Sequence, residues 1–133
     1  MYFEYDKDQS IHVPEPFKRV ITPMMCTDTV DGRPLPFSVH FTEWEPGKKV
    51  DMHNHPTAME AMYCLSGTAR AKIDGKWVDF TPGKMIVADK HEEHCIENTG
   101  NELLRVLCIF APPVSGADLR DRALGAVADA NKE

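Results

Sequence analysis

The sequence predicts an all-β fold, either an antiparallel barrel or a sandwich of two sheets. Residues 68–74, 76–80 and 85–88 each have the length of a strand, and they are separated by the turn sequences Asp74-Gly75 and Thr81-Pro82-Gly83. Several short strands at even spacing are typical of these two architectures. With 133 residues, the chain is long enough to bury one core and too short for two.

The chain before the barrel has a different character. Residues 1–34 contain four prolines and no strong hydrophobic period. We expect an N-terminal arm here, with an edge strand at residues 18–22, that lies on the barrel or on a partner subunit. The barrel is expected over residues 35–113. It includes the nearly unbroken apolar run 103–111, whose length and β-branched content predict a buried strand.

The C-terminal tail, residues 114–133, changes pattern again. Ser115 and Asp118 have the spacing of a helix capping pair. A weak helical stripe follows them, formed by Leu119, Ala123, Leu124 and Val127. Gly125 disfavours one continuous helix. We predict a short helix here and assign no chemistry to it.

Apolar and polar residues alternate from Phe37 to Thr42, which is the period of a half-buried strand. His40 lies on the polar face of this strand. If that face points into a pocket, His40 is a candidate catalytic or substrate-contacting residue. If the face points outward, His40 is a surface histidine.

The composition argues against several classes of partner. The formal net charge is −6 and there is no basic run, which disfavours nucleic acid. No apolar stretch follows a charged N-terminal region, so we expect neither a signal peptide nor a membrane span. We therefore expect a cytoplasmic protein whose partner is a small-molecule substrate.

The four cysteines lie singly in apolar segments and show no C-x-x-C spacing; they are Cys26, Cys64, Cys95 and Cys108. This pattern favours small buried side chains in a reducing cytoplasm over a disulfide framework. Cys64 has the same strand parity as Glu60, so it is a candidate catalytic residue inside the barrel.

The segment 47–67 carries the densest group of metal-binding residue types: His53, His55 and Glu60. In an extended strand, residues i and i+2 point to the same face, so two imidazoles at this spacing can converge on one metal ion. Pro56 ends that strand, and after a short turn Glu60 opens a second strand with a carboxylate. Three ligand atoms are then expected to face one point.

A fourth candidate ligand, His94, lies further along the chain. The spacing Gly47-x5-His53-x-His55-x4-Glu60-x6-Gly67 matches the first motif of the cupin superfamily at all five fixed positions, and His94-x3-Asn98 resembles the end of the second motif. The resemblance covers about residues 37–111. The second motif departs from the family at Asp89 and His91, which stand where proline and glycine are usual.

The resemblance implies a jelly-roll barrel, also called a double-stranded β-helix, with one divalent transition metal. It assigns the metal ligands to His53, His55, Glu60 and His94. It also implies a homodimer, because cupins commonly pair and because the N-terminal arm can add to a partner's sheet edge. We expect His91 on a solvated rim, and we expect the Asn98 side chain to fix a turn.

Three imidazoles and one carboxylate suit Fe, Mn, Ni, Co or Zn, and the set lacks the thiolates of structural zinc sites. On an octahedral ion, two neighbouring positions stay open for substrate, water or dioxygen. We expect a metal-dependent enzyme that acts on a small carboxylated or oxygen-rich metabolite by lyase, isomerase or oxygenase chemistry, with Glu60 as a ligand and a catalytic group. The alternatives are an Fe(II) dioxygenase and a non-catalytic module that binds a small ligand.

A narrower resemblance is to ectoine synthase, a small cupin hydro-lyase that closes a ring from an acetylated diamino acid. It is carried by three stretches, residues 60–64, 89–94 and 105–116. It implies metal contacts at Glu60 and His94. The metal-binding tyrosine of that family falls at Ile86, which cannot coordinate a metal.

Overall fold

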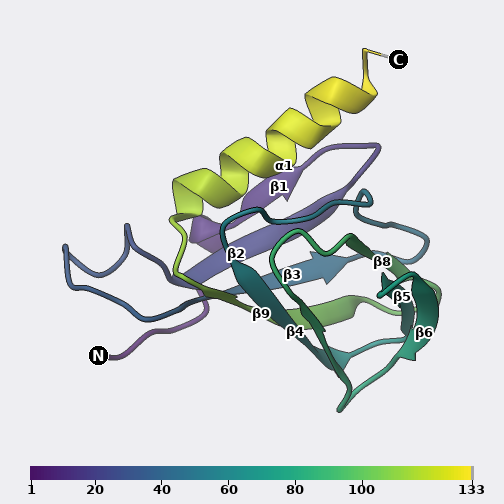
Figure 1. Cartoon of the computed structure of the whole chain (residues 1–133), viewed down its shortest axis with the longest axis horizontal. Coiled ribbons are helices and arrows are strands. Elements are labelled where there is room, and N and C mark those ends of the chain that lie inside the picture. Colours follow the sequence, from purple (N-terminus) through teal and green to yellow (C-terminus); the bar gives the residue numbers. More distant parts are fainter. Residues whose placement is uncertain (133) are drawn as a thin grey trace.

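The computed structural model describes residues 1–132 and confirms the all-β prediction. Two antiparallel sheets form a jelly-roll barrel, with strand orders β1-β2-β3-β9-β4-β7 and β6-β5-β8 (Figure 1). The elements are η1 (Lys7–Gln9), β1 (Ile11–Val13), β2 (Arg19–Met25), β3 (Ser38–Trp44), β4 (Met59–Ser66), β5 (Ala69–Ile73), β6 (Lys76–Phe80), β7 (Met85–Ala88), β8 (His94–Asn98), β9 (Leu104–Ala111) and α1 (Gly116–Ala130).

The predicted apolar strand near residue 103 is β9, and it is the central strand of the larger sheet. It pairs with β3 on one side and β4 on the other. Its register places Cys108 opposite His40 in β3 and opposite Met62 in β4. The same register places Phe110 opposite Glu60. Strands that are distant in the sequence therefore bring these side chains to one part of the barrel interior.

The N-terminal region belongs to the larger sheet. The strand expected at residues 18–22 is present as β2, but the prediction that it forms an edge is wrong, because β1 pairs along its outer side. Pro23 lies within β2, where a proline cannot donate a ladder hydrogen bond. The register shifts between Pro23 and Met25, and this bulge accommodates the proline.

The alternating strand β3 points its polar face inward. Ser38, His40 and Thr42 are buried, whereas Val39 and Phe41 on the other face are only partly buried. Hydrophobic alternation alone assigns the apolar face to the core, and here that assignment is reversed because the polar side chains line an internal cavity. This orientation favours the pocket alternative for His40.

Two turns have the backbone that their sequences predict. Asp74 and Gly75 both have positive φ, 52° and 70°, and they join β5 and β6 in a tight hairpin. Gly67, with φ of 97°, leaves no room for a side chain, because an added Cβ would lie 2.8 Å from the Leu103 carbonyl oxygen and from the Leu104 Cα. Position 67, the last of the first motif, therefore requires glycine both for its positive φ and for the lack of space.

The predicted helix is present as α1 and runs through Gly125 without interruption. Ser115 and Asp118 form the predicted capping box. Asp28 adds to this cap, since its carboxylate accepts hydrogen bonds from the backbone N–H groups of Gly116 and Ala117.

The helix packs at the edge of the larger sheet, beside the edge strand β1 (Figure 1). Leu119, Ala123 and Val127 are buried there in a cluster that includes Ile11. Leu124, which the sequence placed in the same stripe, is 40% exposed. The buried stripe therefore follows the spacing i, i+4, i+8.

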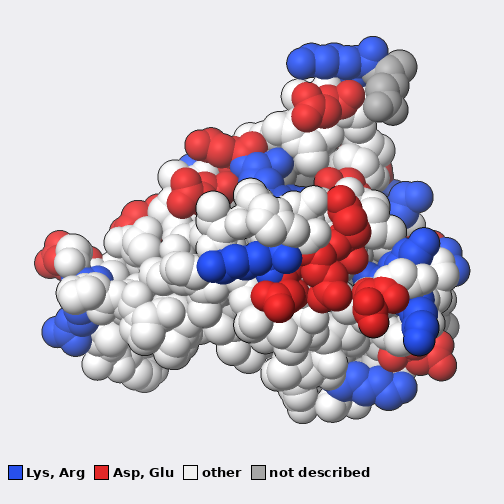
Figure 2. Space-filling model, viewed as in Figure 1, with Lys and Arg blue, Asp and Glu red and all other residues white. Residues whose placement is uncertain are grey.

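The prediction of small buried cysteine side chains is confirmed, since all four cysteines are free and buried. Within residues 1–132, no helix combines the length and the apolar character that a membrane crossing requires. Figure 2 shows acidic and basic side chains interspersed on the viewed face.

Replacing Gly67 by alanine should lower the free energy of unfolding by roughly 2–4 kcal/mol, because the new Cβ meets backbone atoms and φ is positive. Chemical denaturation measures this change. Gly125→Ala is the matched control. Gly125 lies in a helix with open space around it, so alanine there should raise the free energy of unfolding by about 1 kcal/mol. A neutral Gly67→Ala would contradict the packing described.

Candidate metal centre

The segment that carries His53 and His55 is held against β8 by backbone contacts. It is extended but is not a regular strand, since its pairing consists of isolated bridges, Lys49 with Glu97 and His53 with His94. The N–H and carbonyl groups of His53 and His94 exchange hydrogen bonds of 3.1 and 2.8 Å. The His91 N–H also donates to the His55 carbonyl at 2.9 Å. The candidate ligands therefore keep their relative positions through the backbone.

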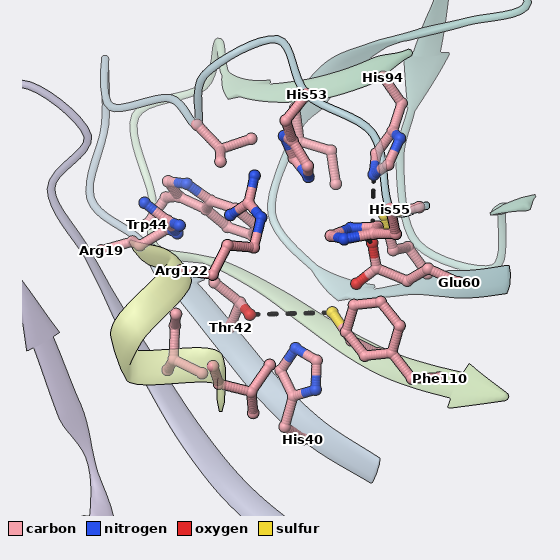
Figure 3. Close-up of a pocket in the computed structure, with 16 residues that line it drawn as sticks. Arg19, His40, Thr42, Trp44, His53, His55, Glu60, His94, Phe110 and Arg122 are labelled. Carbon is pink, nitrogen blue, oxygen red and sulfur yellow. Dashed lines mark hydrogen bonds and ion pairs between the residues drawn. The ribbon is translucent and has the colours of Figure 1, made fainter. Parts of the chain in front are cut away.

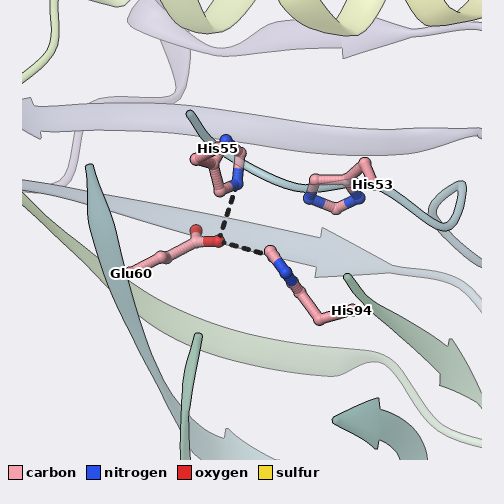
Figure 4. A group of neighbouring side chains, drawn as sticks. All are labelled: His53, His55, Glu60 and His94. Carbon is pink, nitrogen blue, oxygen red and sulfur yellow. Dashed lines mark hydrogen bonds and ion pairs between the residues drawn. The ribbon is translucent and has the colours of Figure 1, made fainter. Parts of the chain in front are cut away.

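The structure brings all four predicted ligands together. One nitrogen from each of His53, His55 and His94 and one oxygen of Glu60 lie within 4.8 Å of one another (Figure 4). The ring centroids of His53 and His94 are 4.3 Å apart, and those of His53 and His55 are 4.9 Å apart. Glu60 and His94 are buried, and the two other histidines are partly buried.

Backbone carbonyls fix the orientation of two of the imidazoles. His53 Nδ1 donates to the Asp51 carbonyl at 2.6 Å, and His94 Nδ1 donates to the Glu92 carbonyl at 2.9 Å. A carbonyl can only accept, so the proton of each neutral ring is on Nδ1 and the Nε2 lone pair is free. Such contacts are the usual support of metal-binding histidines.

The free nitrogens face a carboxylate. Nε2 of His55 and Nε2 of His94 both lie 3.2 Å from the same oxygen of Glu60. With Nδ1 of His94 occupied, its neutral ring presents a lone pair to this negative oxygen, which is repulsive unless a cation lies between them. The cluster therefore requires positive charge, either a proton or a metal ion.

The pKa shifts of these residues agree with this need for positive charge. Burial alone would raise the pKa of Glu60, but hydrogen bonds from His55 and His94 hold it far below its usual range. Burial lowers the pKa of His94, but the hydrogen bond to Glu60, the bond to the Glu92 carbonyl and the charge of Glu60 together raise the pKa overall. Burial, and then repulsion from Arg122, lower the pKa of His53 to about 2. His53 is thus a neutral ring, which is the form that binds a metal.

The four side chains fit a divalent transition metal. Nitrogen and carboxylate oxygen donors suit these ions, and the donors are close enough to converge on one ion. No cysteine belongs to this group of four, so the donor set differs from that of structural zinc sites.

The candidate ligands lie in the wall of an internal cavity of about 50 Å³ (Figure 3). The apolar part of the wall includes Val50, Met62 and Ile96. Met62 shares the inward face of β4 with Glu60, as strand parity predicts. A cavity of this size holds a few water molecules or part of a small ligand.

His40 lines this cavity and lacks a partner for one of its nitrogens. Its Nδ1 is buried and makes no hydrogen bond with the described residues. The ring stacks on Phe110, with centroids 5.6 Å apart. Burial lowers the pKa of His40 to about 4, against the opposing attraction of Glu60. His40 is therefore a neutral imidazole with an unused polar atom, as a substrate contact requires.

Cys64 does not line the cavity, so the prediction that it is a catalytic residue of this site is wrong. Cys64 is buried in the apolar core, and its thiol contacts the Ser66 carbonyl. Strand parity gives the face but not the depth, and Cys64 lies four residues from Glu60, roughly 13 Å along the strand. Cys108 lines the cavity instead, within 4.8 Å of Glu60 and His40. Burial raises the pKa of the Cys108 thiol, which keeps it protonated.

Three further residues of the cavity wall were not identified from the sequence: Arg19, Trp44 and Arg122. Arg19 alternates with Ile21 on the buried face of β2, so strand parity was the available signal. Arg122 lies beside the buried Leu119 and Ala123 on α1. No sequence pattern indicated that this helix faces the site, and the prediction that it carries no chemistry missed this residue.

Three other polar residues, His91, Asn98 and Arg70, do not line the cavity. His91 is exposed, as expected for a rim residue. The Asn98 side chain fixes the turn that follows β8, because it donates to the carbonyls of Trp44 and Glu102 and accepts from the Gly100 N–H. Arg70 is exposed and binds Glu97 at 2.9 Å.

Residues 40–110 match the Cupin_2 family, whose description is Cupin domain. This range holds all four candidate ligands and more than half of the chain. This chain belongs to the cupin family.

Among curated cupins, the chain is 37% identical over 89 residues to L-ectoine synthase from Bordetella avium (strain 197N), and the match covers 64% of each protein. It is 32% identical over 88 residues to L-ectoine synthase from Vibrio parahaemolyticus serotype O3:K6, covering 64% of this chain and 66% of the relative. The chain thus spans just under two thirds of the length of these relatives.

Solved cupin structures show the same architecture. Ectoine synthase from P. lautus matches with a TM-score of 0.69 and 26% identity, covering 88% of this chain and 78% of the other. The structure of a predicted oxalate decarboxylase from Thermotoga maritima matches with a TM-score of 0.67 and 23% identity, covering 81% and 97%. The second likeness concerns the fold alone.

This cupin keeps the turn of the second motif despite its unusual residues. His91, which stands where the family usually has glycine, has φ of 65°. The position therefore keeps the left-handed conformation that glycine adopts readily. Asp89 supports the turn, since its backbone N–H donates to the Glu92 side chain and its carbonyl accepts from the Glu92 N–H.

In the metal-free protein, the free energy of unfolding should fall as the pH is lowered from 7 to 5. The unfolded chain protonates His40 near its ordinary pKa of 6.5, whereas the folded chain does so only near 4. The unfolded state then binds more protons, and His40 alone accounts for about 2 kcal/mol of this loss. His40→Gln should remove that part of the pH dependence, measured by urea unfolding at both pH values.

The exposed His12 offers the matched control for this measurement. His12→Gln should keep the full pH dependence of the wild-type protein. An equal pH dependence in His40→Gln and the wild type would contradict a neutral, buried His40.

Proposed function

We propose that this cupin is a metal-dependent lyase that acts on a small carboxylated or oxygen-rich metabolite. The metal is held by His53, His55, Glu60 and His94. One observation carries the proposal: two imidazole nitrogens lie 3.2 Å from a single carboxylate oxygen in a buried site, an arrangement that needs a cation. Ligand spacing and donor chemistry agree with this.

A metal bound at this site would polarise a substrate oxygen or lower the pKa of a bound water molecule. The chain contributes the rest of the chemistry from β3 and β9. His40 presents an unpartnered Nδ1 to the cavity, and Thr42 Oγ1 lies 3.8 Å from the protonated Cys108 thiol. These groups are suited to orient a substrate and to hold a proton beside Glu60.

The relatives favour lyase chemistry over isomerisation or oxygenation, since the curated matches named above are L-ectoine synthases. The substrate of this chain should nevertheless differ from theirs. Ile86 occupies the position of the metal-binding tyrosine implied by the ectoine synthase resemblance, and it does not line the cavity. His53 and His55 supply ligand atoms in its place.

The protein purified without added metal should contain close to one equivalent of a divalent transition metal, by inductively coupled plasma mass spectrometry. His53→Ala and His55→Ala should each lower that content at least about tenfold, because each removes one of four ligands. The metal-loaded wild type should convert a small carboxylated metabolite under strict anaerobiosis, with loss of water or another small group detected by mass spectrometry. Both variants should lose this turnover.

His91→Ala is the matched control, because His91 is a nearby histidine that is exposed and lies outside the cluster. It should retain both metal and turnover. Turnover that requires oxygen would contradict the lyase proposal in favour of a dioxygenase. Metal binding without turnover of any small acid would favour the non-catalytic module, and absence of metal would contradict the metal centre itself.

We also propose that the protein is a homodimer that pairs through the outer face of the larger sheet. In four of its six strands, β3, β9, β4 and β7, the outward side chains are largely apolar; they include Val39, Phe41, Leu107, Ile109, Ala61, Tyr63, Met85 and Val87. Met85 and Val87 are 54% and 44% exposed. A continuous apolar face of this kind is typical of subunit contacts.

Size-exclusion chromatography with light scattering should give a molar mass twice that of one chain. Leu107→Glu should yield the single-chain mass, because it places a charge on the central strand of this face. Val78→Glu is the control, since Val78 is an exposed valine in the smaller sheet. A wild-type mass of one chain would remove the dimer proposal.

A further inference from the structure

A second polar group lies in the wall of the cavity, apart from the candidate metal ligands. Arg19 from β2, Trp44 from β3 and Arg122 from α1 gather at one end, and the four candidate metal ligands gather at the other (Figure 3). Arg19 and Trp44 are 5% and 3% exposed. None of these three residues belongs to the cluster that fits a metal.

Trp44 carries a hydrogen-bond donor without a partner. Its indole Nε1 is buried and bonds to no atom of residues 1–132. An indole N–H can only donate, and leaving a buried donor unpaired costs about 1–3 kcal/mol. The apolar ring would pack equally well without this group, so packing does not account for it. An acceptor in the cavity would.

The two arginines supply positive charge that their neighbours offset only in part. Within the described residues, the Arg19 guanidinium donates one hydrogen bond, from Nη1 to the Phe17 carbonyl at 2.8 Å. Burial, and then repulsion from Arg122, lower the pKa of Arg19 to about 10, so the group stays charged at neutral pH. The second arginine, Arg122, has its Nη2 atom 3.6 Å from Asp51 Oδ2, and this distance is longer than that of a strong charged hydrogen bond.

The position of Arg122 connects this end of the cavity to solvent. Arg122 and His53 line both the internal cavity and an outer groove of about 520 Å³ between α1 and residues 51–54. The Arg122 side chain is 31% exposed. Arg122 therefore joins the cavity to the groove, whose other charged lining residues are Asp51, Asp121 and Asp129.

We propose that Arg122, Arg19 and Trp44 Nε1 form a carboxylate-binding subsite, which holds the acid group of the substrate while another part of the substrate reaches the metal ligands. This inference rests on the proposed function and extends it, because it names the substrate class as a carboxylic acid. A carboxylate has two oxygens with about four acceptor positions, enough for an indole N–H and two guanidinium groups. Its planar shape matches the fork of an arginine.

The test compares propionate with propionamide, which have nearly the same shape but differ in charge. Binding to the full chain is measured by NMR titration, with the metal loaded and after removal by a chelator. The metal-free wild type should prefer propionate by about tenfold or more, the contribution of charged hydrogen bonds. Arg122→Met keeps the aliphatic stem and should abolish the preference, and Trp44→Phe should weaken propionate binding several-fold.

Arg120→Met is the matched control, because Arg120 is an exposed arginine on the same helix. It should leave the preference unchanged. The subsite would be disproved by a metal-free wild type without preference, by an unchanged preference in Arg122→Met, or by inorganic phosphate binding more tightly than propionate. Binding that appears only with metal and is insensitive to Arg122 would leave the metal centre intact and remove the subsite. Failure of the metal centre alone would leave the Arg122-dependent preference in place.

Discussion

The structure depends on one electrostatic constraint: three imidazoles and a carboxylate are held so close together that the site requires a cation. One oxygen of Glu60 lies 3.2 Å from the Nε2 atoms of His55 and His94, and the Nδ1 proton of His94 is already bonded to a backbone carbonyl. Side chains free to move would separate. They are held because the segment with His53 and His55 is bonded through its backbone to the strand that carries His94. The barrel thus supplies a preorganised ligand set.

The cavity has two poles of different chemistry. One pole holds the candidate metal ligands, a carboxylate and three imidazoles, and the opposite pole combines two guanidinium groups with an indole donor. Apolar side chains such as Met62 and Ile96 lie in the same wall. They keep the local dielectric low, which strengthens every polar contact to a bound molecule. This arrangement suits a ligand that has a carboxylate at one end and a metal-binding group at the other.

Much of the candidate metal centre could be predicted from the sequence, because the spacing of its residues encodes local geometry. The pair His53 and His55, the carboxylate of Glu60 and the glycine at position 67 lie within one segment, and the hairpin at Asp74 and the helix cap at Ser115 are equally local. Such features need only the periodicity of a strand or the backbone preference of a turn.

The rest of the site depends on contacts between distant parts of the chain. Arg19 and Arg122 meet only because α1 folds back along β1, and no local pattern specifies this. Cys108 replaces Cys64 in the cavity because the register of β9 with its neighbours decides which sulfur lies beside Glu60. Parity identifies a face of the barrel, whereas depth and neighbours come from tertiary packing.

The two tryptophans of this chain lie in opposite surroundings. Trp44 is buried in the cavity wall, and Trp77 is 45% exposed, with the Arg70 guanidinium 4.0 Å above its ring. The indole emission spectrum depends on local polarity, so we expect the two residues to emit at different wavelengths, with the blue-shifted component from Trp44. With Trp77 replaced by phenylalanine, the tryptophan fluorescence comes from Trp44 alone and should change when a molecule binds in the cavity.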